Sequence, residues 1–306
     1  MALAVGCAAL AWVLHGVGLA AVAQDAARAG WVLPATAGVH LIQLYLSAQA
    51  WRASLGTAGI GRAEIFRLRW IREGINALLP VAQIGGQVVT ARILTRDGLA
   101  PILAVSGTVL DVTLEAAAQL IFTLAGAAIL LATRHDGAWT QWAGASLGLM
   151  AAGVAALVAA QRLGGLRLVE AAVTRLAAAW PVASGWSANG LHDTLMARQA
   201  DRAAVARAVC LHTLSWTLGG AEVWIALAAL HHPVGLVDAA IIEALAMTAR
   251  SVGFAVPGAV GIQEGGFVVA CSLFGVPAEA ALALSVLKRL REVLVGIPAL
   301  IAWHYG

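Results

Sequence analysis

The chain of 306 residues is 61% apolar and only 11% charged, and its mean hydropathy is +0.85. These values exclude a soluble globular domain and indicate an integral membrane protein. The formal net charge of +3 does not imply a nucleic-acid partner.

Apolar runs separated by turn signals predict six membrane spans, near residues 2–23, 32–52, 99–132, 138–161, 206–230 and 277–305. Two further apolar stretches, near 63–97 and 236–275, are interrupted by Pro, Gly, Gln and charged residues. We expect each to form a re-entrant helical hairpin. The fold class is therefore all-α: a polytopic membrane protein with about six spans and two hairpins.

The Arg residues indicate the orientation of the spans. Thirteen of them follow the second and fourth spans, whereas the segments 24–31, 133–137 and 231–238 contain only Arg28 and Arg134. By the positive-inside rule the Arg-rich segments, and with them both termini, are cytoplasmic. The segment near 162–205 is expected to be an amphipathic surface helix; a binding element is the alternative. The thirteen are Arg52, Arg62, Arg67, Arg69, Arg72, Arg92, Arg96, Arg162, Arg167, Arg175, Arg198, Arg202 and Arg207.

An internal repeat emerges when the chain is shifted along itself by 177 residues. The shift superimposes Pro80 on Pro257, Gly98 on Gly275, and Glu115 on Glu292. Each half, 1–132 or 133–306, then contains two spans, a hairpin and a third span. Because three is odd, the halves have opposite orientations, and the first hairpin enters from the cytoplasm. Inverted repeats with broken helices point to transporters with a site near the midplane, although duplication also occurs in membrane proteins of other functions.

Charged residues lie in the middle of the third and sixth spans. Asp111, Glu115 and Gln119 recur every four residues and form one polar stripe. A charge at the bilayer centre costs about 2.5–3.5 kcal/mol on insertion scales, so these groups must face protein or a wet cavity. We expect the acids to pair with the cations of the sixth span, either as a structural clasp or as a headgroup or gating site. Glu222 and Arg250 form a weaker candidate pair.

The hairpins supply further polar groups, because irregular backbone at membrane depth must be buried or line water. Asn76 and the glycines are assigned first to capping and turn geometry. The proposed pathway or headgroup residues are Arg72, Glu73, Asn76, Gln83, Gln87, Asp111, Glu115, Arg250, Gln263, Glu264, Lys288, Arg289, Arg291 and Glu292. The proposed hairpin-motif residues are Pro80, Gly85, Gly86, Pro257, Gly258 and Gly261.

No motif for a metal, a cofactor or a catalytic nucleophile is found. The eight His and three Cys are scattered without ligand spacing, and there is no P-loop, dinucleotide fingerprint or nucleophile elbow. We therefore expect neither metal nor cofactor, and we do not expect an enzyme. The remaining enzymatic alternative is acid–base chemistry in the membrane by Asp111 and Glu115.

The sequence "VPGAVGIQEGG" at 256–266 resembles the second-hairpin motif of the family named after the transmembrane region of lysylphosphatidylglycerol synthase, also called flippase-like proteins. Pro257, Gly258, Gly261 and Glu264 fall on that motif. "RWIREGINALLPVAQIGGQVVTARIL" and "LDVTLE" are similar to the hopanoid-biosynthesis-associated branch of this family. The first hairpin departs from the broader family, which carries an Arg three residues after the proline and an acid nearby, by having Gln83 and Gln87.

The resemblance implies a lipid-handling protein of the bacterial inner membrane. Well-known members join this membrane region to a cytosolic aminoacyl-transfer domain, for which 306 residues leave no room, so we expect no synthesis of aminoacyl lipids. The implied function is translocation of a lipid or lipid-linked intermediate, with a hopanoid or an anionic phospholipid as the candidate partner. The alternative is a non-transporting scaffold for hopanoid-modifying enzymes.

Overall fold

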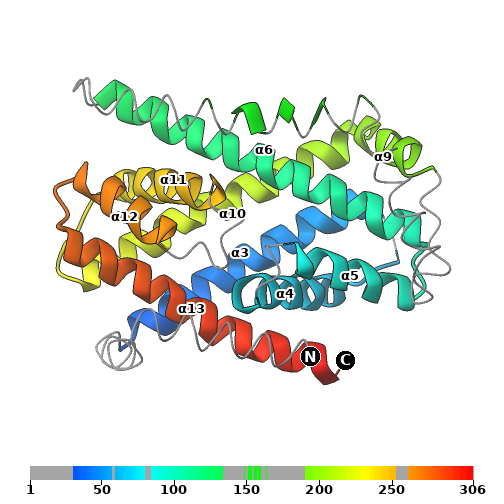
Figure 1. Ribbon diagram of the computed structural model, residues 1–306, viewed down its shortest axis with the longest axis horizontal. Coiled ribbons are helices and arrows are strands. Elements are labelled where there is room, and N and C mark those ends of the chain that lie inside the picture. Colours follow the sequence, from blue (N-terminus) through cyan, green and yellow to red (C-terminus); the bar gives the residue numbers. More distant parts are fainter. Residues whose placement is uncertain are drawn as a thin grey trace.

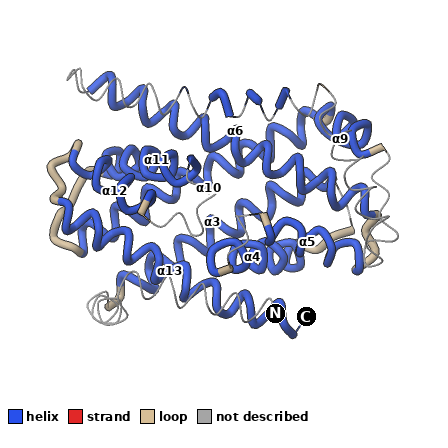
Figure 2. Tube along the Cα trace, viewed as in Figure 1, coloured by secondary structure: helices blue, strands red, loops and turns tan. Residues whose placement is uncertain are grey.

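The computed structural model describes residues 30–56, 59–79, 84–133, 190–252 and 261–305, together with nine positions between 148 and 163. Every regular element in these ranges is an α-helix, as Figure 2 shows, which confirms the all-α fold class. The predicted span near 2–23 and most of the one near 138–161 lie outside these ranges.

Four predicted spans correspond to long helices. They are α3 (Val32–Leu55), α6 (Pro101–Thr133), α10 (Arg202–Ala229) and α13 (Ala278–Tyr305). Local sequence sets their ends: α3 stops at Gly56, whose φ of 61° is left-handed and suits glycine. The Asp201 carboxylate accepts a hydrogen bond from the Ala204 N–H at 3.0 Å and so caps the start of α10, four residues earlier than predicted.

Among the described helices, α6 is long and apolar enough to cross a membrane by length and composition. By contrast, α13 carries four ionisable residues between positions 288 and 292, which lower its hydropathy. The six-span arrangement and the inverted repeat therefore stay predictions.

Each predicted hairpin is a pair of packed helices. The first comprises α4 (Arg62–Leu78) and α5 (Gly85–Arg96), and the second comprises α11 (Leu236–Val252) and α12 (Ile262–Ser272). Leu79 ends α4 in an extended conformation (φ −109°, ψ 147°), as expected for the residue before a proline. Pro80, Gln83, Pro257 and Gly258, which lie between the paired helices in the sequence, fall outside the described residues.

A glycine in the second helix of each hairpin allows its two helices to approach closely. A Cβ at Gly86 would collide with the carbonyl oxygen of Arg72. A Cβ at Gly266 would lie 2.9 Å from the Cβ of Ala249. Both are the second glycine of a "GG" pair, in "GGQVV" and "GGFVV". In both hairpins, therefore, the two helices pack closely at the second glycine of a "GG" pair.

The long helices enclose the hairpins, as Figure 1 shows. Helix α6 runs along one edge and contacts α5 and α11, whereas α13 runs along the opposite edge and contacts α4 and α12. Helices α3 and α10 cross the middle and pack against each other. Each of α6 and α13 thus touches both helix pairs.

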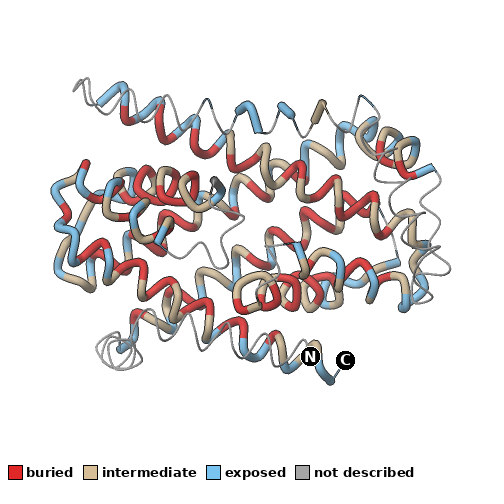
Figure 3. The backbone as a smooth tube through the Cα atoms, in the orientation of Figure 1, coloured by how far each residue is buried: buried red, intermediate tan, exposed pale blue. Residues whose placement is uncertain are grey.

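The two largest apolar clusters stabilise this arrangement, and buried positions line the inner sides of the helices in Figure 3. One core joins α10, α11, α12 and α13 around Phe267, and the other joins α3, α4, α5 and α6 around Trp51. The short helix α9 (Leu191–Ala200) buries Leu191 and Leu195 and packs on α6. It lies in the predicted amphipathic segment near 162–205, whose last residues belong to α10.

Candidate functional site

A cavity of about 350 Å³ lies between the two hairpins. Seven helices contribute to its wall: α3, α4, α5, α6, α10, α11 and α13. Most of its lining side chains are polar, which is unusual for the interior of a membrane protein. These polar residues are His40, Gln43, Ser47, Arg69, Arg72, Glu73, Asn76, Gln87, Glu115, Gln119, Ser215, Glu243, Arg250, Ser251, Lys288, Arg291 and Glu292.

The first charge cluster joins α4 to α6 and consists of Arg69, Arg72, Asp111, Glu115 and His212. Arg72 donates to Asp111 (Nη1 to Oδ2, 2.7 Å) and to Glu115 (Nη2 to Oε2, 3.2 Å). Arg69 donates to both oxygens of Glu115, at 2.5 and 3.1 Å. Two cations therefore neutralise two anions in a buried space.

Helical spacing creates this cluster. Asp111 and Glu115 are four residues apart on α6, and Arg69 and Arg72 are three apart on α4, so each pair projects from one face of its helix. The guanidinium of Arg72 also lies 5.6 Å from the ring centroid of Trp51, a cation–π contact from α3. Rigid helices thus fix the whole cluster.

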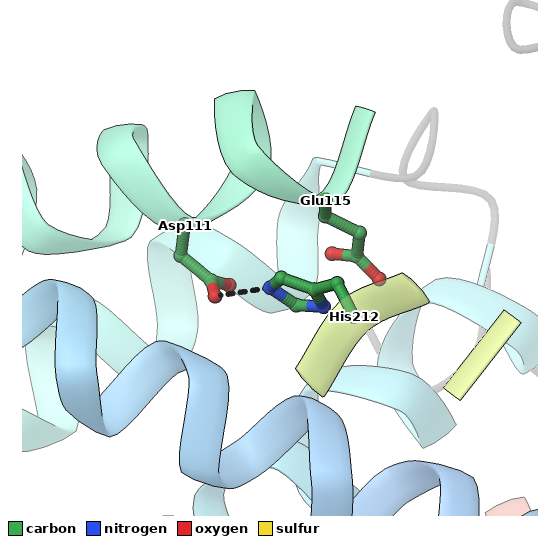
Figure 4. Close-up of side chains that lie close together, drawn as sticks. All are labelled: Asp111, Glu115 and His212. Carbon is green, nitrogen blue, oxygen red and sulfur yellow. Dashed lines mark hydrogen bonds and ion pairs between the residues drawn. The ribbon is translucent and has the colours of Figure 1, made fainter. Parts of the chain in front are cut away.

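His212 approaches the first charge cluster from α10. Its Nε2 lies 3.0 Å from Asp111 Oδ1, and Figure 4 shows the imidazole between the two carboxyl groups. Asp111, Glu115 and His212 are close enough to one another to ligate a metal ion. Guanidinium groups already occupy Asp111 Oδ2 and both Glu115 oxygens, and their positive charge would repel a cation, so these residues do not fit a metal.

The second charge cluster joins α10, α11 and α13 and consists of His40, Glu222, Glu243, Lys288 and Arg291. Lys288 Nζ donates to Glu243 at 2.8 Å and to Glu222 at 3.4 Å. Arg291 donates to both oxygens of Glu222, at 2.9 and 2.8 Å. His40 Nδ1 lies 2.7 Å from Arg291 Nη1, which ties α3 to the cluster. This cluster also contains two cations and two anions.

Side chains also close the two hairpins. Asn76 Oδ1 accepts from the Gly86 N–H at 2.9 Å, and Asn76 Nδ2 donates to Gln87 at 3.0 Å. In the second hairpin, Arg250 Nη1 donates to Gln263 at 2.8 Å and to Glu292 at 2.6 Å. In each hairpin, therefore, a side chain of the first helix binds the first turn of the second helix.

The expected pairing between the third and sixth spans was wrong. The acids of α6 bind the arginines of the first hairpin, and Lys288 and Arg291 bind acids of α10 and α11. The candidate pair of Glu222 with Arg250 was also wrong, because Arg250 pairs with Glu292. Arg69 and Arg72, both counted among the cytoplasmic charges, are buried.

The predicted site residues divide into three groups. Asp111 and Gln263 are fully buried and bind cavity-lining arginines. Glu264 accepts from the Gly261 N–H at 2.7 Å, where Gly261 has a φ of 83°, and it pairs with Arg289 at 2.7 Å; neither Glu264 nor Arg289 lines the cavity. The predicted residues in the cavity wall are Arg72, Glu73, Asn76, Gln87, Glu115, Arg250, Lys288, Arg291 and Glu292.

Sequence reasoning did not select several members of the site. His40, Arg69, His212 and Glu243 belong to the charge clusters. The rule that an ionisable residue inside the membrane is a functional candidate by default could have found His40 and His212, which lie within predicted spans. Gln119, noted in the polar stripe, binds Ser251 at 2.7 Å and joins α6 to the second hairpin.

Residues 1–299 match the family model for the lysylphosphatidylglycerol synthase TM region. The chain therefore belongs to this family, and it is a membrane protein. No curated protein and no solved structure matches the chain significantly.

Proposed function

We propose that this member of the lysylphosphatidylglycerol synthase TM family translocates a lipid, or a lipid-linked intermediate, by passing its polar headgroup through the central cavity. The observation that carries the proposal is the cavity itself: about 350 Å³ of space, walled by ionisable side chains, between two hairpins of broken helix. Moving a charged headgroup through hydrocarbon is prohibitively unfavourable unless polar groups replace its water.

The proposed architecture is an inverted repeat of six spans and two hairpins, in the bacterial inner membrane with both termini in the cytoplasm. The matching glycine contacts of the two hairpins support it, as does the position of α6 and α13, each in contact with both hairpins. Movement of one hairpin relative to the other would expose the cavity to alternate sides, as in other inverted-repeat transporters.

The proposal includes no catalysis. Asp111 is engaged by Arg72 and His212, and Glu115 by two arginines, so neither carboxylate is left as a free general base. A link to hopanoid or other envelope lipid metabolism is part of the proposal and rests on the sequence resemblance of the first hairpin.

Filling the cavity tests the proposal. Ala116 lines the cavity on α6, and Ala116→Trp would place an indole in it without removing an ion pair. Ala125 on the same helix is exposed, so Ala125→Trp is the matched control. The assay uses proteoliposomes that carry acyl-labelled fluorescent phospholipids. Dithionite added outside quenches only label in the outer leaflet, so loss of the inner-leaflet label reports translocation. We expect Ala116→Trp to slow it at least tenfold and Ala125→Trp to leave it unchanged.

Two results would contradict the proposal. One is that wild-type protein, correctly folded in the vesicles, moves no phospholipid or hopanoid lipid faster than empty vesicles. The other is that Ala116→Trp and Ala125→Trp both move lipid at the wild-type rate. Co-purification of hopanoid-modifying enzymes in the first case would favour the scaffold function instead.

A further inference from the structure

Most charges in the cavity wall already have partners. In the first charge cluster, Arg69 and Arg72 are bound by Asp111 and Glu115. In the second, Lys288 and Arg291 are bound by acids in the same way. These side chains are also nearly inaccessible, with no more than 7% of any of the four cations exposed. Neither cluster has much capacity left for a ligand.

Arg250 differs from the other cavity cations. Its side chain is 20% exposed, and only Nη1 is used, by Glu292 and Gln263. Within the described part of the chain, Nη2 and Nε have no acceptor. These two N–H groups form one edge of the planar guanidinium, and such an edge binds two oxygens of a phosphate at once. Arg250 therefore offers an open phosphate-binding edge in the cavity wall.

Glu73 is the anionic counterpart of Arg250. It lies on α4, is half-buried and lines the same cavity, yet among the described residues it forms no ion pair. Glu73 interacts electrostatically with Arg250 and with Arg69, although it forms a salt bridge with neither of them. A half-buried carboxylate with no salt-bridge partner is incompletely compensated, so Glu73 is poised to receive a positive group.

Glu73 and Arg250 occupy equivalent places in the two hairpins. The shift of 177 residues that superimposes Glu115 on Glu292 also superimposes Glu73 on Arg250. One lies on the first helix of the first hairpin and the other on the first helix of the second hairpin. The two halves thus present opposite charges to one cavity from matching positions.

We infer, on the basis of the proposed translocation function, that the cavity selects a zwitterionic headgroup that carries one phosphodiester and one primary ammonium group. The phosphodiester binds the open edge of Arg250, and the ammonium binds the Glu73 carboxylate. A purely anionic headgroup satisfies Arg250 but leaves Glu73 unpaired, and its own charge repels Glu73. The cavity therefore discriminates by the ammonium group rather than by the phosphate.

The test compares two lipids with the same labelled acyl chains, phosphatidylethanolamine and phosphatidylglycerol, in the dithionite assay. We expect wild-type protein to move phosphatidylethanolamine about tenfold faster. Glu73→Gln should abolish this preference by slowing phosphatidylethanolamine. Glu64→Gln is the matched control on the same helix, because Glu64 is 39% exposed, pairs with Arg67 and does not line the cavity, and it should keep the preference.

A second measurement separates this inference from the proposed function. Native mass spectrometry of the detergent-purified protein, incubated with an equal mixture of the two lipids, reports which lipid is retained without requiring transport. The zwitterion inference is overturned if the wild type retains and transports phosphatidylglycerol as well as or better than phosphatidylethanolamine. It is also overturned if the preference for phosphatidylethanolamine survives Glu73→Gln. In both cases the proposed translocation stands. Preferential retention of phosphatidylethanolamine without any transport would support the binding site and contradict translocation.

Discussion

The first charge cluster can be tested by a double-mutant cycle on Arg72 and Asp111. Asp111→Asn keeps an oxygen for His212 but removes the negative charge, which leaves a net positive charge in a buried space. Arg72→Met leaves a net negative charge there. Removing one partner of a buried ion pair costs about 3–5 kcal/mol. We expect the cost of Asp111→Asn to lie near the lower end of this range, because Arg72 still binds Glu115 at 3.2 Å.

The double variant restores neutrality, because Arg69 and Glu115 remain paired. Its remaining cost is that of imperfectly satisfied polar groups, about 1–3 kcal/mol. The double variant should therefore lose much less free energy of unfolding than the sum of the losses of the two single variants. The free energy of unfolding is measured in mixed micelles with increasing SDS, followed by circular dichroism.

The pair of Arg67 and Glu64 on α4 provides the control cycle. Both are about a third exposed, so their coupling should be only about 0–1 kcal/mol. If the losses for Arg72→Met and Asp111→Asn simply add, the two charges do not act as a buried pair, and the cluster described above is not the one that stabilises the protein.

Two further predictions concern the hairpins. Gly266→Ala should destabilise the protein by about 1–3 kcal/mol through overpacking against Ala249. A Cβ at Gly265 meets no atom within 4 Å, so Gly265→Ala should be neutral or slightly stabilising. Equal melting temperatures for the two variants would refute this prediction. Asn76→Ala removes the acceptor for the Gly86 N–H and should lower the free energy of unfolding by about 1–2 kcal/mol. Gln87→Ala removes only the contact with Asn76 Nδ2 and should lower it less. If unfolding in mixed micelles shows that Gln87→Ala costs as much or more, Asn76 has no capping role.

Four of the predicted spans correspond to helices of the described residues, because helix ends depend on local signals. Helix α4 ends at Leu79, before a proline, and α3 ends at Gly56, and both ends have causes in backbone conformation that need no tertiary information. The polar stripe was also predictable, since spacing by four residues places Asp111, Glu115 and Gln119 on one face of any helix.

The partners of that stripe could not be predicted. Complementary signs in the third and sixth spans suggested one clasp, but charge signs do not specify which helices pack together. In the structure Asp111 and Glu115 face α4, whereas Gln119, one turn further on, faces α11 and Ser251. One helix face thus serves both hairpins, and this division follows from the crossing of the helices rather than from the sequence of α6.

The pairing of charges sets an order of events during synthesis. Arg72 precedes Asp111 by 39 residues, so when α6 leaves the ribosome its acids already have partners in the chain. Glu222 enters with α10 near His40 of α3, and Lys288 follows it by 66 residues. At about 5–20 residues per second, that delay is several seconds. In a nascent chain that ends after α6, Asp111 and Glu115 can already pair with Arg72 and Arg69, whereas in one that ends between α10 and α13 Glu222 still lacks Lys288 and Arg291.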